Sequence, residues 1–402
     1  MNSKIPIAFI SFTIALAGCA SQDGATAPPE KIQVTQLHML NRHDGWAWSG
    51  GLAGHQSLLR TSDGGTTWQD VTPREISHIE EGASFLDAHT AWVSFFNRTN
   101  VTAGMLQTID GGKSWSLLNQ TNTPIFNEAS SCRFFNSTYG IGNSWDGGAG
   151  SSYVTFFETH DSGRTWSRIP FMPRHPESAE PNTFHLSNIG EDRIAFYPPA
   201  SVIITYGDTA DEQSKGVARF SITTNLGKTW RDVELPLPTQ FHNSLCVPLE
   251  PVFVDKKNIV LAAHVFESLS NSYSTGSLIF YTSRDGGASW ASRAGTVDLK
   301  QPWYGDGFQV VSPDCFLVAS GSAIQVTHNA AQSWQTLTPN ILFGANSKRD
   351  IVRMNFVDAH HGWLVISDSN EFHPDGNFIL YRTSNGGKTW NELPARIAKK
   401  KD

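Results

Sequence analysis

The chain of 402 residues carries 30 Lys and Arg against 37 Asp and Glu, a net charge of −7 with His neutral. Apart from residues 399–401 it has no basic run, so nucleic acid is not an expected partner, because phosphate binding requires clustered Lys and Arg. Gly (34), Phe (24) and Trp (13) are abundant, and no long stretch carries apolar residues at helical spacing. The composition therefore favours an all-β protein.

Residues 1–18 are predicted to be an export signal. One Lys precedes an apolar run over residues 5–17, which is shorter than the roughly 20 residues needed to span a bilayer. The sequence LAGC at residues 16–19 resembles the lipobox of bacterial lipoproteins. This resemblance implies cleavage before Cys19 and attachment of lipid to it. An ordinary signal with an incidental Cys is the alternative.

Residues 19–31 are predicted to be a flexible tether, because they are small, polar and contain Pro. Ala20, rather than Asp, follows Cys19. Among lipoproteins of cells with two membranes, that residue favours the outer membrane. We therefore expect an exported protein, held at the membrane of a bacterial envelope through Cys19.

An eight-residue segment, here called the Asp box, recurs seven times in the form Ser/Thr-x-Asp/Asn-x-Gly-x-Ser/Thr-Trp, with Ala at the fifth position of the sixth copy. The copies are residues 61–68, 108–115, 159–166, 223–230, 283–290, 327–334 and 383–390. Asp or Asn opens a turn by accepting N–H groups downstream, Gly supplies positive φ, and Trp anchors the hairpin. The acidic or amide residues are Asp63, Asp110, Asp161, Asn225, Asp285, Asn329 and Asn385. Because three are uncharged, we predict a structural rather than a catalytic or metal-binding role.

Four strand-like runs accompany each Asp box. In the first unit they are residues 34–40, 46–49, 57–61 and 67–71, and in the last 352–357, 363–367, 378–383 and 388–393. The box Trp residues lie 44 to 64 residues apart, which is typical of propeller blades. We predict a monomeric, single-domain, seven-bladed β-propeller over residues 32–397, with an Asp box between strands three and four of each antiparallel blade and a basic tail at 398–402. Six or eight blades are the alternatives, and an eighth blade would lie in the long interval from Trp166 to Trp230.

A second phrase precedes strand two in three units: NRHDGW at 41–46, DAHTAW at 87–92 and DAHHGW at 358–363. Together with the Asp boxes it resembles the bacterial neuraminidase repeat propellers, and in particular their photosystem II assembly-factor-like branch. The resemblance implies a propeller with a binding or assembly role. His43, His89 and His360 hold equivalent positions in this phrase, which raises a three-imidazole metal site as an alternative. We expect exposed turn residues instead, and neither a metal nor a cofactor.

Three cysteines follow Cys19, namely Cys132, Cys246 and Cys315. An odd number in an exported chain allows at most one disulfide among them. Each lies in an apolar, strand-like context. One disulfide with one thiol, or three buried thiols, are therefore both open.

Meander geometry indicates where ligands bind. Turns between strands one and two and between strands three and four share one end of the ring, here called the box end. The remaining connections share the opposite end, here called the loop end, where long segments on a rigid scaffold favour binding. Those segments are residues 143–152, 198–216, 267–277 and 367–377 within blades, and 72–82, 170–185, 236–248, 295–307 and 338–350 between blades.

The candidate binding residues combine aromatic, cationic and acidic side chains, as an interface or ligand site requires. They are Arg74, Glu81, Trp145, Asp146, Arg174, His175, Tyr206, Trp303, Tyr304, Asp306, Arg349 and His373. Trp145 and Trp303 lead the set, because each Trp lies in a loop without local packing partners.

Two functions compete. The first is a non-catalytic, membrane-tethered scaffold whose loop end holds an envelope protein, a peptide or a glycan. The second is a sialidase-like glycoside hydrolase, in which Arg74, Arg174 and Arg349 clamp a carboxylate and Tyr206 or Tyr304 is the nucleophile. The Arg-Ile-Pro that sialidases carry before the first Asp box is absent there; it occurs at residues 168–170, after the third. The sequence favours the scaffold and assigns no catalytic residue.

Overall fold

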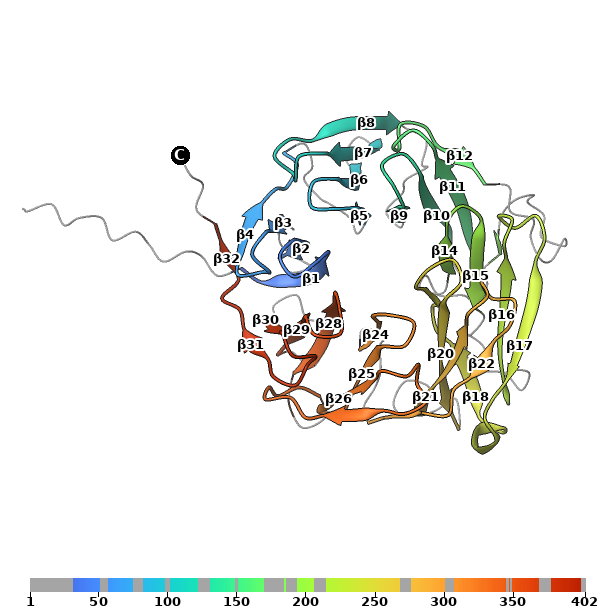
Figure 1. Ribbon diagram of the computed structural model, residues 1–402. Coiled ribbons are helices and arrows are strands. Elements are labelled where there is room, and N and C mark those ends of the chain that lie inside the picture. The colour runs from blue at the N-terminus through green and yellow to red at the C-terminus, as the bar shows by residue number, and fades with distance from the viewer. Residues whose placement is uncertain are drawn as a thin grey trace, which may run out of the picture.

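The computed structural model describes residues 32–50, 57–74, 82–97, 102–121, 131–148, 151–169, 184–185, 194–205, 215–267, 276–300, 307–344, 347, 349–368 and 377–398. Seven sheets stand around a ring, each built on antiparallel strands that are consecutive in the chain, and the first also takes in the last strand, β32 (Arg396–Ile397) (Figure 1). The predicted seven-bladed, all-β propeller is confirmed. In the described part of the chain, no helix has the length and apolar character needed to cross a membrane.

Blades 1 to 3 hold the first thirteen strands. Blade 1 contains β1 (Val34–Met39), β2 (Gly45–Ser49), β3 (Ser57–Thr61) and β4 (Thr67–Asp70), and blade 2 contains β5 (Ala83–Phe85), β6 (Ala91–Asn97), β7 (Thr102–Thr108) and β8 (Ser116–Thr121). Blade 3 contains β9 (Ser131–Phe134), β10 (Gly140–Gly148), β11 (Ser151–Thr159) and β12 (Ser167–Arg168), with β13 (Phe184–His185) added beside β11. The long interval after Trp166 thus adds a strand to blade 3.

Blades 4 to 7 complete the ring. Blade 4 contains β14 (Ile194–Tyr197), β15 (Ser201–Thr205), β16 (Val217–Thr223) and β17 (Arg231–Pro236), followed by the short helix η2 (Thr239–Phe241). Blade 5 contains β18 (Leu245–Pro248), β19 (Val252–Phe253), β20 (Ile259–Phe266), β21 (Gly276–Ser283), β22 (Ala291–Ser292) and β23 (Val297–Leu299). Blade 6 contains β24 (Phe308–Val310), β25 (Phe316–Ser320), β26 (Ala323–Thr327) and β27 (Gln335–Leu337). Blade 7 contains β28 (Asp350–Phe356), β29 (Gly362–Ser367), β30 (Phe378–Thr383) and β31 (Asn391–Glu392).

The hydrophobic core lies between neighbouring blades. In strand β20 all eight residues are buried, because successive side chains point to opposite faces and each face meets another blade. Val260 and Ala262 pack with Phe316 of blade 6, whereas Ile259 and Leu261 pack with Ile203 of blade 4. Each blade therefore depends on both neighbours, as expected for a closed ring of repeats.

The ring closes where blade 7 meets blade 1, and the sheet of blade 1 holds strands from both ends of the chain. A two-residue strand, β32 (Arg396–Ile397), runs parallel to the outermost strand β4, and the Ile32 N–H donates to the Ala395 carbonyl at 2.9 Å. Two side chains also cross the junction. The indole N–H of Trp363 donates to Gly64 O at 2.9 Å, and the backbone N–H of Met39 donates to Asn355 Oδ1 at 2.6 Å.

Candidate functional site

The Asp box is a turn held together by two of its own side chains. In the first copy, the buried Thr61 hydroxyl donates to Asp63 Oδ1 at 2.9 Å and accepts the Gly65 N–H at 3.0 Å. Asp63 also accepts the backbone N–H and the hydroxyl of Thr67, at 2.9 and 2.7 Å. The same bonds between first, third, fifth and seventh positions recur in the other six copies.

The hydroxyl at the seventh position explains why Asp and Asn are interchangeable. In the copies with Asp, this hydroxyl donates to the carboxylate, as Ser114 does to Asp110 at 2.6 Å. In the copies with Asn, the amide donates to the hydroxyl, as Asn225 does to Thr229 at 2.8 Å. A hydroxyl can serve in either direction, so the turn survives loss of the charge.

These hydrogen bonds also set the acidity of the box carboxylates. The hydroxyl and N–H of Ser114 lower the pKa of Asp110 to about 2, and those of Ser289 lower the pKa of Asp285 to about 2. Donors favour the charged form. A carboxylate that stays ionised and is occupied by its own turn is a poor general acid at neutral pH.

At the box end, every Asp box is joined to the turn between strands one and two of its own blade. The N–H at the fourth position donates to a backbone carbonyl there at 2.8 to 3.0 Å, and the acceptors are His43, His89, Thr138, Ala200, Lys257, Asp314 and His360. His43, His89 and His360 therefore take part through their backbone, and their side chains are exposed. Among the described residues, no three His, Cys, Asp or Glu side chains gather as a metal site would require.

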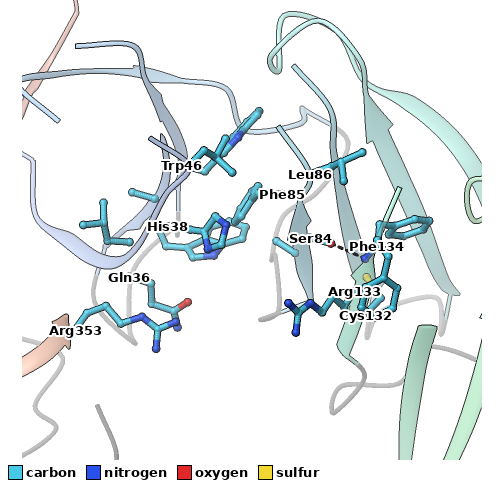
Figure 2. A pocket seen from close by; sticks show the side chains of 16 residues that line it. Gln36, His38, Trp46, Ser84, Phe85, Leu86, Cys132, Arg133, Phe134 and Arg353 are labelled. Carbon is cyan, nitrogen blue, oxygen red and sulfur yellow. Dashed lines mark hydrogen bonds between the residues drawn. The ribbon is translucent and has the colours of Figure 1, made fainter. Parts of the chain in front are cut away.

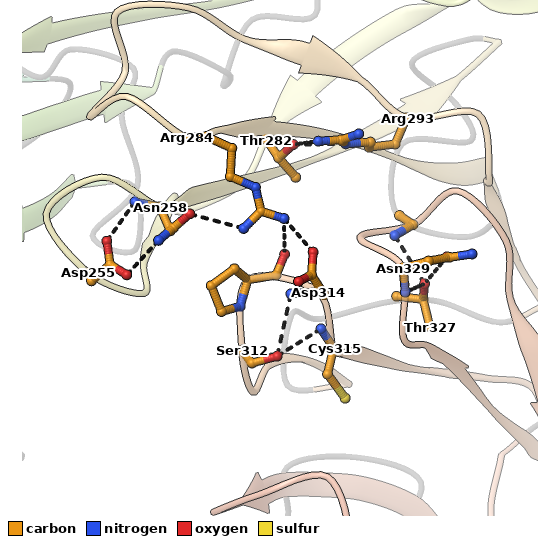
Figure 3. A network of polar contacts seen from close by, with 12 residues as sticks. Asp255, Asn258, Thr282, Arg284, Arg293, Ser312, Asp314, Cys315, Thr327 and Asn329 are labelled. Carbon is orange, nitrogen blue, oxygen red and sulfur yellow. Dashed lines mark hydrogen bonds and ion pairs between the residues drawn. The ribbon is translucent and has the colours of Figure 1, made fainter.

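Arginine side chains tie the box end of one blade to the next. Arg284 of blade 5 donates to Asn258 Oδ1 and to the Pro313 carbonyl, both at 3.0 Å, and pairs with Asp314 of blade 6 (Figure 3). Arg60 likewise reaches the Ala88 carbonyl at 2.8 Å, from blade 1 to blade 2. The box end is thus a belt of structural contacts.

The structure describes few of the residues predicted to bind at the loop end. Arg74 is exposed beyond β4, and Arg349 is half-buried just before β28. The other candidates lie outside the residues or side chains that the structure describes, namely Glu81, Trp145, Asp146, Arg174, His175, Tyr206, Trp303, Tyr304, Asp306 and His373.

The interpretation of residues 143–152 as a loop is wrong. Strand β10 extends to Gly148 and strand β11 begins at Ser151, and the two pair in unbroken register from Gly140↔Thr159 to Gly148↔Ser151. The backbones of Trp145 and Asp146 pair with Val154 and Tyr153. The glycines of this segment led to the loop interpretation, but neighbouring strands can pair through Gly at modest cost.

A cavity of about 600 Å³ opens on the centre of the ring, here called the channel pocket (Figure 2). Its walls come from the inner strands β1, β5 and β9, from β2, and from Arg353 on β28. Figure 2 shows Arg353 and Gln36 on one side and Arg133 on the other, with His38 over Phe85 between them. The ring centroids of His38 and Phe85 are 5.7 Å apart.

The electrostatics of the channel pocket are those of a cationic site. Solvent reaches His38 from the channel, but the walls surround the rest of its ring. This burial, with the charges of Arg353 and Arg133, lowers the pKa of His38 to about 4, because both effects penalise the imidazolium. The described residues that line the pocket include neither Asp nor Glu. Among these described residues, the groups charged at neutral pH are the two guanidinium groups.

Three polar residues of the channel pocket, His38, Ser84 and Arg133, hold a position that repeats around the ring. It lies three residues before the Asp, Asn or Ser that opens the turn between strands one and two. In three blades this side chain accepts the N–H of the next inner strand. Asn355 bonds Met39, Ser84 bonds Phe134 and Gln309 bonds Phe356, at 2.6 to 2.8 Å. Blades 1 and 3 carry His38 and Arg133 there instead. Among the described residues, neither makes such a bond.

The channel pocket was not predicted from the sequence, although a signal was present. Polar His38 stands between apolar Leu37 and Met39, and polar Arg133 between Cys132 and Phe134. Such alternation in an innermost strand directs one side chain in two toward the channel.

The cysteines beyond residue 31 are buried thiols. Cys132, Cys246 and Cys315 are all free, which decides between the two alternatives left open above. Burial raises the pKa of Cys132 to about 12. Since the thiolate is the nucleophile, Cys132 is inert at neutral pH although it lines the channel pocket.

No protein-family description matches this sequence, and no curated protein does either. Among solved structures, an ulvan lyase of polysaccharide lyase family PL25 is similar at 9% identity and a TM-score of 0.52, over 92% of this chain and 98% of that one. YCF48 from Cyanidioschyzon merolae is similar at 13% identity and a TM-score of 0.49, over 89% and 97%. The α-L-arabinofuranosidase of Fusarium graminearum, from family GH93, is similar at 12% identity and a TM-score of 0.42, over 75% and 92%. At 9% identity the likeness to the ulvan lyase shows a shared fold and no activity.

Proposed function

We propose that this chain is a non-catalytic, membrane-tethered binding or assembly scaffold of a bacterial envelope. One observation carries the proposal: all seven Asp or Asn side chains of the Asp boxes are engaged by hydroxyl and N–H groups of their own turns. A catalytic or metal-binding acid needs oxygens that are available to a substrate or ion. These side chains instead stabilise the corners of a rigid ring.

The partner is proposed to bind at the loop end. Contacts between blades occupy the box end, as those of Arg60 and Arg284 illustrate. The connections that vary most in length belong to the opposite end, and such connections on a rigid scaffold tolerate the variation that recognition requires. The resemblance of the repeats to photosystem II assembly-factor-like propellers supports an assembly role.

The proposed anchor is Cys19. The first described residue, Ile32, lies beside Ala395 at the junction of blades 7 and 1, so the tether of residues 19–31 would leave the ring at that junction. Lipid attachment is tested by metabolic labelling with a fatty acid in the native host. The wild-type chain should carry label in the membrane fraction, and Cys19→Ala should carry none. Equal labelling of both chains would refute the anchor.

The partner face is tested by photo-crosslinking in intact cells. A photoreactive side chain at Trp303 or Arg74 is expected to give a discrete crosslinked product. The same group at the exposed box-end residues Lys113 and Lys388 is the matched control and is expected to give none. Crosslinking from the box end alone would place the partner on the wrong face and refute the proposal.

The glycoside hydrolase alternative finds no support in the channel pocket. Glycosidases require a pair of carboxyl groups, or in sialidases a Tyr nucleophile with a Glu partner. The described residues that line the pocket supply no Asp, Glu or Tyr. A panel of fluorogenic glycosides that includes sialosides should therefore release no fluorophore above a heat-treated control. Turnover that depends on Tyr304 or Tyr206 would overturn the scaffold proposal.

A further inference from the structure

We propose that the channel pocket binds a small organic anion with two or more negatively charged oxygens, held between Arg133 of blade 3 and Arg353 of blade 7. The ligand class includes dicarboxylates, sugar phosphates, sulfated sugars and uronates, which share this chemistry. This site is separate from the partner face proposed at the loop end. An experiment can therefore refute one of the two proposals without refuting the other.

The two guanidinium groups enter one cavity from different parts of the ring. Arg133 is an exposed side chain of β9, and Arg353 an exposed side chain of β28. Both line the channel pocket, and Figure 2 shows both pointing into its open space. Guanidinium groups match carboxylate, phosphate and sulfate oxygens through planar pairs of N–H donors.

Arg133 is held in place by an aromatic ring. Its guanidinium carbon lies 5.5 Å from the ring centroid of Phe135, which is within cation–π range. A guanidinium over an aromatic face keeps its N–H donors directed outward in its own plane. The side chain is thus ordered before a ligand arrives, which reduces the entropy lost on binding.

The described part of the lining is cationic. Its residues include no carboxylate, and burial with the two Arg charges keeps His38 neutral at pH 7. Walls of low dielectric concentrate the field of clustered charges in a concave site. The charges of Arg133 and Arg353 therefore favour an anion here, although the chain as a whole carries −7.

The volume and the apolar wall favour an organic anion over a bare inorganic ion. About 600 Å³ lies within the range typical of small-molecule pockets. Half-buried Phe85 and Phe135 supply an apolar surface beside the Arg residues. The amide of Gln36 and the one N–H of neutral His38 can donate hydrogen bonds to hydroxyl or carbonyl groups of the ligand.

The first experiment uses the purified full chain in isothermal titration calorimetry with succinate, citrate, glucose 6-phosphate, glucuronate and sulfate. At least one organic anion should bind saturably, and succinamide, the neutral counterpart of succinate, should not. Binding should weaken as NaCl rises, because salt screens the attraction. If sulfate alone binds, the site takes inorganic ions and the organic class is wrong. If no anion binds, or succinamide equals succinate, the proposal is overturned.

The second experiment assigns the site. Arg133→Gln and Arg353→Gln should each weaken the best anion about tenfold or more, since each removes charge-assisted hydrogen bonds. Lys113→Gln removes the same charge at the box end and should leave affinity unchanged. Circular dichroism of each variant checks folding, and the comparison of succinate with succinamide decides the question on the wild-type chain if an Arg variant misfolds. If well-folded Arg variants bound the anion as tightly as the wild type does, the anion would bind elsewhere than in the channel pocket.

Measuring the affinity for the anion across a pH series tests the role of His38. If His38 were purely structural, the affinity would not depend on its protonation. The charged groups facing this ring are Arg353 from β28 and Arg133 from β9. Glucuronate and sulfate are used here, because both stay ionised from pH 7 to pH 5. Such an anion offsets the Arg charges and favours the imidazolium, so its binding takes up a proton and tightens as pH falls over this range. His38→Gln should flatten this dependence. A wild-type affinity for these anions that weakens over the same range would contradict the placement of the anion beside His38.

Discussion

Two glycines at the same position of different Asp boxes offer a matched test of how the blades pack. Gly112 in blade 2 and Gly387 in blade 7 both occupy the fifth position, with φ of +82° and +86°. A Cβ on Gly112 would lie 2.5 Å from the Cβ of Val71 in blade 1, whereas the nearest atom to a Cβ on Gly387 is 3.6 Å away. Alanine is therefore strained at both positions but collides only at the first.

The expected magnitudes follow from these contacts. A left-handed backbone costs an L-residue about 1–2 kcal/mol, and both variants share this term. Overpacking a well-filled contact adds about 1–3 kcal/mol, for Gly112→Ala alone. The sixth Asp box already carries Ala331 at this position, with φ of +60°. Gly387→Ala should therefore lose about 1–2 kcal/mol and Gly112→Ala about 2–5 kcal/mol.

Urea unfolding followed by Trp fluorescence measures the difference. Because a propeller of this size can unfold in more than one step, the midpoints of the first transition are compared at a fixed protein concentration. Gly112→Ala should unfold at clearly lower urea than Gly387→Ala. Equal midpoints would refute the reasoning, since the shared backbone strain would then account for the whole effect and the contact with Val71 for none of it.

Three further changes test other contacts. Thr383→Val leaves the N–H of Gly387 without its buried acceptor and should cost about 1–3 kcal/mol in urea unfolding. Asp110→Asn should be nearly neutral at pH 7, because Asn serves in three other boxes. Between pH 4 and pH 2 the variant should become more stable than the wild type, since the lowered pKa of Asp110, about 2 against 3.8 in the unfolded chain, confers stability on the wild type that is lost on acidification. Deleting residues 394–402 removes β32 from β4 and should lower the melting temperature and speed hydrogen exchange in β4.

Each of these has an outcome that contradicts it. An unchanged urea midpoint for Thr383→Val would show that water replaces the hydroxyl. A difference in melting temperature between Asp110→Asn and the wild type that stays constant from pH 7 to pH 2 would show that this carboxylate carries no ionisation-linked stability. For the C-terminal deletion, removal of residues 399–402 alone is the control and should change nothing. Equal loss from both deletions would mean that β32 does not hold the ring closed.

The sequence alone determined the position of the blade corners and predicted seven blades, a number that the structure then decided against six or eight. The hydrogen bonds of an Asp box join residues within four positions of one another, as Thr61, Asp63, Gly65 and Thr67 do. Such local bonds produce a sequence pattern that is still recognisable when Asn replaces Asp. Strand bounds in the first unit were likewise predicted to within one residue, because the Asp box and the alternation of side chains are also local. The predicted outer strand at 388–393 was too long: β31 covers Asn391–Glu392 alone.

Only the tertiary structure decided what lies between the blades. The channel pocket brings together Arg133 and Arg353, which are 220 positions apart in the chain. No local sequence pattern predicts that these two side chains line one cavity. The neutrality of His38, the seating of β32 on β4 and the burial of three free thiols likewise depend on neighbours from other blades. Turns are encoded by adjacent residues, whereas a cavity and its charge are set by side chains that the closed ring brings close in space.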